Sequence, residues 1–421
     1  MAHIGLLCTP GSGQYNSVIP LGQELQQRGH RVFLCSFPEV EAVAVTAKLE
    51  FISVLPPDCN LGASGQAPSQ FASLSGLAYL RKSCELGQPL FRLRLQGLPA
   101  ALKAANVDFL VINSMVLDGS SVAEALGLPF VTVFSSLMPA WDMQVPPFTT
   151  PWRYERNLWA MLRNAWGYRR LRWALQPFLD VIAEYRQQEG LQPIMHPNQY
   201  FSSLAQISQQ PPALEYPDRA LPEYLHFTGP HHSLESRPSV DFPWDRLGDR
   251  PLIYASMGTN TNRHFDVYCT IAQACEPLDV KLVIALGGAA EPETLPSLPG
   301  NPLVVRYAPQ LDILNRAALM ISHGGMNSTL ECLARSVPMV IIPIALDQPG
   351  VAARIAWAGA GEFILLNQLN VDGLRLAIQK VLTQPSYKEN SRRLQQSIQQ
   401  AGGVTRAIDI VEQVLAAKKL S

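Results

Sequence analysis

Residues 304–348 have the sequence VVRYAPQLDILNRAALMISHGGMNSTLECLARSVPMVIIPIALDQ, and the expected fold rests on this segment. It contains a short apolar run at 319–322, a loop of small and polar residues at 323–328, and apolar residues at helical spacing in 329–335. Short apolar runs predict buried strands, and a spacing of three to four residues predicts a helix. The segment therefore predicts a strand, a glycine-containing loop and a helix, the repeating unit of an α/β fold.

The loop at 323–328 has the composition of an anion-binding turn. Gly324 and Gly325 let the backbone approach a ligand closely, and the free N–H groups at the start of the following helix favour a negative charge. His323, Asn327 and Ser328 add side-chain donors beside these N–H groups. We predict that these five residues hold a pyrophosphate group.

Polar and aromatic residues around this loop suit the rest of a nucleotide sugar. Glu331 lies one helical turn beyond Ser328, where a carboxylate can accept hydrogen bonds from both hydroxyls of a ribose. Asp347 and Gln348 end a second apolar run and offer acceptors and donors to sugar hydroxyls. Tyr307 provides a ring on which a base can stack.

The whole segment resembles the donor signature of the UDP-glycosyltransferases of glycosyltransferase family 1. The positions in register are Pro309, Gln310, His323, Gly324, Gly325, Asn327, Ser328, Glu331, Pro338, Asp347 and Gln348. The resemblance implies an α/β protein of the GT-B class, with two Rossmann-like domains facing a cleft, and inverting sugar transfer. It further implies donor-site roles for Ser256, Gly258, Thr259, Gln310 and the backbone of Ala308. Held in this way, the leaving UDP requires no metal ion.

The first strand and turn resemble the start of the same family. An apolar strand at 2–8 precedes a glycine-containing turn, and a helix is expected from about residue 17 to 28. The family's catalytic histidine falls on Gln14, and the aspartate that orients it falls on Asn113, at the end of an expected strand over 109–113. Both members of the catalytic dyad are therefore amides in this chain.

A glutamine can orient a hydroxyl but cannot take its proton near neutral pH, and losing a general base costs about 10² to 10⁴ in rate. Three interpretations follow. The chemistry is slow and depends on Gln14, held by Asn113, positioning the acceptor. Alternatively, another carboxylate acts as the base, with Asp118 the nearest in sequence. Alternatively, the protein binds its ligands without turnover.

The bulk composition limits the partners. The 421 residues carry a formal net charge of −1, which provides no global attraction to nucleic acid. No apolar run is long enough to span a bilayer, and the N-terminus lacks the pattern of a signal peptide, so a cytoplasmic location is expected. The seven cysteines show no metal-ligand spacing, and we predict neither a metal site nor a bound cofactor. The oligomeric state is not predicted.

Residues 141–173 are rich in tryptophan and arginine. The five tryptophans are Trp141, Trp152, Trp159, Trp166 and Trp173, and the last four recur every seven residues, which keeps them near one face of a helix. Six arginines accompany one glutamate between residues 152 and 173. This pattern suits peripheral contact with the inner face of a membrane. It also suits a ridge that packs on the domain and lines an acceptor cleft, and both interpretations imply an apolar acceptor.

The expected domain organisation has four parts. Residues 1–225 form an N-terminal acceptor-binding domain, and 226–250, at the end of a proline-rich stretch, form a linker. Residues 251–400 form the domain that binds the nucleotide sugar. Residues 401–421 include a helix that, in the fold that this chain resembles, crosses back to the first domain.

Residues 201–230 and 347–354 are similar, more narrowly, to bacterial zeaxanthin glucosyltransferases. The predicted function is therefore transfer of a hexose, expected to be glucose from UDP-glucose, to a hydroxyl of a lipophilic acceptor such as a carotenoid. The alternative is a degenerate transferase that binds a carotenoid, a lipid or a nucleotide sugar without turnover. A nucleotide-sugar epimerase or hydrolase on the same fold is a third hypothesis.

Overall fold

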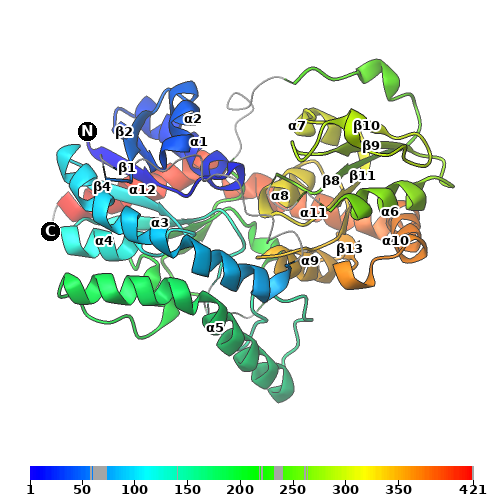
Figure 1. Ribbon diagram of the computed structural model, residues 1–421. Coiled ribbons are helices and arrows are strands. Elements are labelled where there is room, and N and C mark those ends of the chain that lie inside the picture. The colour runs from blue at the N-terminus through cyan, green and yellow to red at the C-terminus, as the bar shows by residue number, and fades with distance from the viewer. Residues whose placement is uncertain are drawn as a thin grey trace.

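In the computed structural model the chain forms two α/β halves, each built on one parallel sheet (Figure 1). The structure describes residues 1–56, 59, 74–139, 141–217, 219, 221–231, 240–259, 262 and 264–419. This arrangement confirms the predicted GT-B class of two Rossmann-like domains. Residues 232–239 of the predicted linker, and 420–421 at the C-terminus, lie outside the described residues.

The first sheet has the strand order β3-β2-β1-β4-β5-β6-β7. Its strands are β1 (His3–Leu7), β2 (Arg31–Ser36), β3 (Glu50–Ser53), β4 (Phe109–Asn113), β5 (Phe130–Phe134), β6 (Gln206–Ser208) and β7 (Leu225–Phe227). The helices of this half are α1 (Ser12–Gln27), α2 (Glu41–Thr46), α3 (Gly76–Ala104), α4 (Gly119–Leu126) and α5 (Leu158–Gln188). The predicted boundary at residue 225 falls inside β7, so the first sheet extends into the predicted linker.

The second sheet has the order β10-β9-β8-β11-β12-β13. Its strands are β8 (Leu252–Ser256), β9 (Lys281–Ala285), β10 (Leu303–Val305), β11 (Ala317–Ser322), β12 (Met339–Ile341) and β13 (Gly361–Phe363). The helices that follow in the chain are α6 (Phe265–Cys275), α7 (Gln310–Leu314), α8 (Met326–Ala334), α9 (Gln348–Trp357), α10 (Val371–Thr383), α11 (Pro385–Ala401) and α12 (Gly403–Lys419).

Most strands are continuous apolar runs because both faces of each sheet are covered. β8 is buried at every residue, and β1 at all but its first. Parallel strands connected through helices have this character, in contrast to the alternating pattern of a half-exposed sheet.

Each sheet has a point at which the strand order reverses, and ligands of parallel α/β folds bind at such points. In the first sheet this point lies between β1 and β4. In the second it lies between β8 and β11. Gln14 and Asn113 therefore belong to the first reversal point, and the loop at 323–328 belongs to the second.

The C-terminal helix packs on the first half of the molecule. The guanidinium of Arg28, which follows the last residue of α1, contacts the carboxylates of Asp409 and Glu412 in α12 at 2.6 and 2.8 Å. Figure 1 shows α12, in red, beside β1 and β4, whereas α11 lies with the second half. The chain therefore passes between the halves again after the second sheet is complete.

Candidate functional site

The loops after β8 and β11 meet because the two strands are neighbours, with Ser256 in register with Ser322. His323 follows β11, and its ring lies between two glycines. A Cβ atom at Gly258 would lie 2.6 Å from the ring, and one at Gly325 would lie 2.5 Å from its Nε2 atom. Both positions therefore need glycine while His323 keeps this orientation.

His323 is neutral at physiological pH. Burial lowers the pKa of its imidazole to about 4, and a hydrogen bond with the backbone of Ser256 offsets part of this effect. A neutral imidazole presents one N–H donor and one acceptor nitrogen. Its single N–H can donate either to the Ser256 backbone or to a diphosphate oxygen, and the residue does not bring a full positive charge.

Three buried polar atoms beside this loop have no partner among the described residues: Nδ1 of His323, Oδ1 of Asn327 and Oγ1 of Thr329. No side chain caps the first turn of α8 either. Buried polar groups are normally satisfied, so unpaired ones need an explanation. A ligand with phosphate oxygens and hydroxyl groups, held at the N-terminus of α8, would provide partners, because Thr329 can donate and the Asn327 oxygen accepts.

Gln310 connects the predicted base end of the site to α8. Its amide nitrogen donates to Glu331 at 2.6 Å and to Ser328 at 3.2 Å, and its oxygen accepts from Tyr254 at 3.2 Å. Glu331 is only 1% exposed, whereas Gln310 and Ser328 are half-buried. A ribose would therefore meet Gln310 and Ser328 first, and would reach Glu331 only if these side chains shift.

Tyr307 offers an open ring surface, with 48% of the residue exposed. Its hydroxyl packs on Gly288, where a Cβ atom would lie 2.1 Å from it, and the Arg306 guanidinium lies 5.6 Å from the ring centroid. Ala308 follows at the start of the turn into α7 and is half-buried. This geometry fits the predicted stacking of a base.

Asp347 and Gln348 lie at the start of α9, and both are already hydrogen-bonded. Asp347 accepts from the backbone N–H of Leu137 in the first half at 2.9 Å. Burial raises the pKa of the Asp347 carboxyl. The oxygen of Gln348 accepts from the backbone of Ile344 and Ala345 at 2.8 and 2.9 Å, which leaves its amide N–H groups for a ligand.

The amide pair predicted at the catalytic position is joined through a third residue. Ser135 donates to the oxygen of Gln14, and Asn113 donates to the Ser135 hydroxyl at 2.9 Å. Asn113 and Ser135 are buried, and Gln14 is half-buried. Asn113 therefore holds Gln14 indirectly. Ser135 was missed in the sequence analysis, although its place directly after β5, beside β4, is the kind of strand-end position where site residues occur.

The structure argues against Asp118 as a substitute base. Both carboxylate oxygens of Asp118 accept from the Arg94 guanidinium at 2.8 Å, and both side chains are 1% exposed. A carboxylate paired and buried in this way cannot take a proton from an acceptor hydroxyl. The prediction for Asp118 is therefore corrected, and its role is to hold α3 against the start of α4.

The two reversal points are in contact with each other. Asn327 donates to the backbone oxygen of Gly13 at 2.9 Å, and the hydroxyls of Ser12 and Thr259 lie 2.9 Å apart. The first residues of helix α1, which include Gln14, therefore touch the predicted donor loops directly. The arrangement brings a group that could orient an acceptor next to groups that could hold a diphosphate.

The five tryptophans do not form one ridge along a helix. Helix α5 begins at Leu158 because Asn157 caps it, accepting from the N–H of Ala160 at 2.8 Å. Trp152 therefore precedes the helix, and it folds back to stack on Trp166 with 6.2 Å between ring centroids. Trp141 lies against Tyr168, which is buried, at 5.1 Å. Of these five tryptophans, Trp159, Trp166 and Trp173 are exposed.

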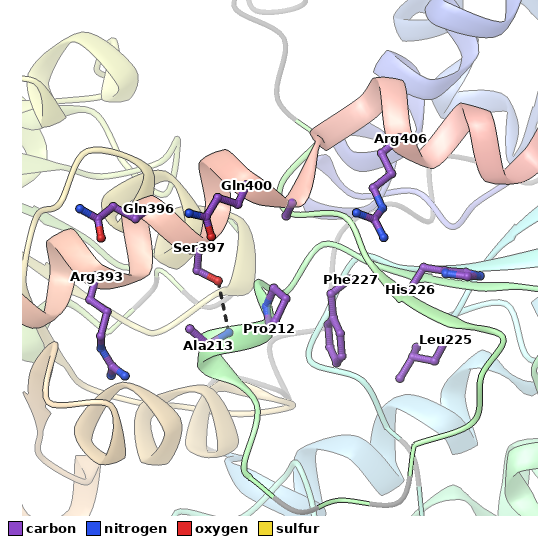
Figure 2. Close-up of a pocket in the computed structure, with 11 residues that line it drawn as sticks. Pro212, Ala213, Leu225, His226, Phe227, Arg393, Gln396, Ser397, Gln400 and Arg406 are labelled. Atoms are coloured by element: carbon purple, nitrogen blue, oxygen red, sulfur yellow. Dashed lines mark hydrogen bonds between the residues drawn. The ribbon is translucent and has the colours of Figure 1, made fainter.

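A groove of about 570 Å³ lies where the two halves are joined (Figure 2). It is lined by residues of β7, α11, α12 and the turn at Pro212–Leu214, and none of the predicted site residues contributes to it. Arg393 and Arg406 lie at opposite ends of the groove in Figure 2, so their charges do not converge on one point. We assign the groove to the connection between the halves and not to the donor site.

Within the described part of the chain, no group of three or more His, Cys, Asp or Glu side chains is placed to hold a metal ion. No described helix combines the length and the hydropathy needed to cross a bilayer.

Comparison with known proteins gave consistent results. The profile of the family described as "UDP-glucoronosyl and UDP-glucosyl transferase" matches residues 183–415. A zeaxanthin glucosyltransferase of Pantoea ananas is 31% identical, covering 99% of this chain and 96% of that protein. A zeaxanthin glucosyltransferase of Pseudescherichia vulneris is 30% identical, covering 99% of this chain and 98% of that protein. Among solved structures, the calicheamicin glycosyltransferase CalG4 superimposes with a TM-score of 0.76 at 22% identity. The match covers 99% of this chain and 98% of CalG4.

Proposed function

This chain belongs to the UDP-glucoronosyl and UDP-glucosyl transferase family, and we propose that it transfers glucose from UDP-glucose to a hydroxyl of a lipophilic acceptor such as a xanthophyll. Transfer of a sugar from a nucleotide sugar follows from the family. The choice of a carotenoid acceptor is supported by similarity to two zeaxanthin glucosyltransferases over almost the whole chain. The unpaired hydroxyl of Thr329, which can donate, and the uncapped N-terminus of α8 support a diphosphate there.

In the proposed reaction the acceptor oxygen attacks the anomeric carbon on the face opposite to UDP, and the bond between that carbon and the diphosphate breaks. The backbone N–H groups at the start of α8, with neutral His323, would stabilise the charge that develops on the leaving group. Tyr307 would stack the uracil, and Asp347 with the amide of Gln348 would hold sugar hydroxyls. These groups would already be in place before the reaction, so they would not need to reorient as charge develops on UDP.

Gln14 would position the acceptor without acting as a base. Its oxygen already accepts from Ser135, so its free amide N–H groups would donate to the acceptor oxygen. The hydroxyl proton would then leave to water. Because general-base catalysis typically contributes about 10² to 10⁴, we expect the rate to depend mainly on positioning and on stabilisation of UDP.

A binding protein without turnover is the second candidate. It is favoured by the two amides at the dyad positions, Gln14 and Asn113, which provide no proton acceptor. The donor loops argue for the enzyme, because a protein that binds only a carotenoid has no need of the polar residues around α8 and α9.

The test is turnover of purified protein with UDP-glucose and zeaxanthin in liposomes, measuring UDP release and the mass of the carotenoid. We expect a carotenoid glucoside, and we expect Gly325→Ala to lower the rate without abolishing folding. Binding of UDP-glucose without glucoside would establish the second candidate. Release of free glucose or of an altered UDP-sugar without acceptor would instead indicate a hydrolase or an epimerase.

A further inference from the structure

The first half of α5 carries an apolar stripe that stays more than half exposed in the described structure, although Trp152 stacks on Trp166. Trp159 is 80% exposed, and Leu162, Trp166 and Trp173 are each 54% exposed. These residues are three, four or seven positions apart, which places them on one side of a helix. A contiguous exposed patch of large apolar side chains usually marks an interaction surface.

The exposure does not result from a loosely packed helix. The opposite side of α5 is buried, including Ala160, Gly167, Leu171 and Ala174. The second half of α5 lies along α3, where Gln88 donates to the backbone of Pro177 at 2.7 Å. Figure 1 shows the first turns of α5 extending away from the rest of the molecule. The stripe is thus presented by a helix that is firmly attached at its other end.

Arginines border the stripe. Arg169 and Arg170 are exposed on either side of it, and the Arg170 guanidinium lies 4.8 Å from the ring centroid of Trp166. At the far end, the Arg81 guanidinium of α3 lies 4.3 Å from the ring centroid of Trp173. Six arginines and one glutamate occur between residues 152 and 173, although the whole chain has a net charge of −1.

We propose that this Trp–Arg face, made of Trp159, Leu162, Trp166, Arg169, Arg170 and Trp173, docks on a bilayer surface that contains anionic headgroups. Indole rings partition to the interface between headgroups and acyl chains, and guanidinium groups bind lipid phosphate. A second copy of this chain fits less well, because a symmetric interface would bring the same arginines together.

One loop would connect the docked face to the predicted donor site. Trp152 stacks on Trp166, and the same loop places the backbone oxygen of Phe148 3.1 Å from the N–H of Gly350 in α9. Gly350 follows Asp347 and Gln348, the predicted sugar-binding residues. A lipophilic acceptor leaving the bilayer would thus meet the donor site beside the docked helix. This last step rests on the proposed function, whereas docking itself does not.

The experiment is flotation of the full chain with vesicles, in the absence of UDP-glucose and carotenoid. Vesicles of phosphatidylcholine with about 30% phosphatidylglycerol are compared with phosphatidylcholine alone, at low and high salt. We expect the wild type to float with the anionic vesicles, several-fold less with the neutral ones, and less at high salt. Bromination of the acyl chains near the headgroups should quench tryptophan emission, and Trp159→Phe should reduce that quenching.

Leu162→Glu is expected to lower the bound fraction about ten-fold or more, because a charge replaces an inserted apolar group. Leu376→Glu is the matched control, since Leu376 is an exposed leucine (66%) on helix α10 of the other half. Equal losses for both variants, or equal binding of the wild type to both kinds of vesicle, would overturn the proposal. So would light scattering that shows a wild-type dimer converted to a monomer by Leu162→Glu. Loss of glucoside synthesis with flotation intact would count against the proposed function alone.

Discussion

The side-chain oxygen of Gln14 accepts a hydrogen bond from the hydroxyl of Ser135. Ser135 is fixed in turn by Asn113, whose amide nitrogen donates to it at 2.9 Å. One of the two lone pairs of this amide oxygen is therefore already used. The amide N–H groups remain, and they can hold an acceptor oxygen but cannot remove its proton.

We predict that Gln14→His combined with Asn113→Asp accelerates glucoside formation by about 10², because the pair restores a general base. The gain should appear only as the pH rises above about 6.5, where an unperturbed imidazole becomes neutral. The measurement is kcat as a function of pH with UDP-glucose and zeaxanthin in liposomes.

Two variants control this experiment. Gln14→Asn with Asn113→Asp carries the same carboxylate without an imidazole and should not be accelerated. Ser135→Ala in the Gln14→His, Asn113→Asp background tests whether the new carboxylate acts through the hydroxyl. If the histidine variant is no faster than the wild type, removal of the acceptor proton does not limit the rate.

Gly325→Ala is predicted to weaken binding of UDP about ten-fold. The backbone of Gly325 has φ −61°, which alanine adopts freely, so the effect comes from the added Cβ atom and its 2.5 Å approach to His323. Crowding of this kind costs about 1–3 kcal/mol when the neighbours cannot move. Calorimetric titration with UDP gives the affinity. In a His323→Ala background, Gly325→Ala should cause no further loss of stability. A loss as large as in the wild-type background would show that the added Cβ atom does not clash with the imidazole.

Asp347→Asn is predicted to increase stability at pH 7 while decreasing sugar transfer. Burial raises the pKa of the Asp347 carboxyl above its usual 3.8, so the folded chain holds this proton more tightly than the unfolded chain does. The stability gained in this way is fully present below pH 3.8, the ordinary pKa of an aspartate. It is lost as the pH rises through the pKa of Asp347 in the folded chain. An asparagine oxygen can still accept from the Leu137 N–H without a buried charge.

Urea unfolding of Asp347→Asn and the wild type between pH 4 and 7 gives the difference in free energy of unfolding. This difference should shrink as the pH falls towards 4. Transfer should fall at least about ten-fold, because hydrogen bonds from sugar hydroxyls to a carboxylate are stronger than those to an amide. A difference in stability that does not change with pH would mean that Asp347 is not the group responsible.

Strands were the most predictable elements, because buried parallel strands are unbroken apolar runs. β4 begins and ends at the residues expected from the sequence, 109 and 113. Helix starts were less predictable. α1 begins at Ser12 and not near residue 17, since its first turn is polar and the apolar pattern begins only at Val18. Gln14 is thus on a helix and not in the preceding turn.

Residues of the site were predictable where one short segment carries them and unpredictable where distant segments combine. The loop at 323–328 contains its own glycines, polar side chains and helix start. Ser135, by contrast, meets Gln14 across 121 positions of sequence, and Arg94 meets Asp118 across 24. No local pattern connects such pairs, which is why Ser135 was missed and Asp118 was considered as one possible base.

Asp118→Asn is predicted to lower stability by about 3–5 kcal/mol, because it leaves the buried guanidinium of Arg94 without a countercharge. The folded fraction should keep the kcat and the pH profile of the wild type, since Asp118 touches no reacting group. Arg94→Met with Asp118→Leu provides the matched control, because replacing both partners of a buried pair by apolar residues is often neutral. Chemical denaturation measures stability, and kcat is corrected for the fraction folded. A folded Asp118→Asn protein with kcat reduced 10²-fold or more would restore Asp118 as the base.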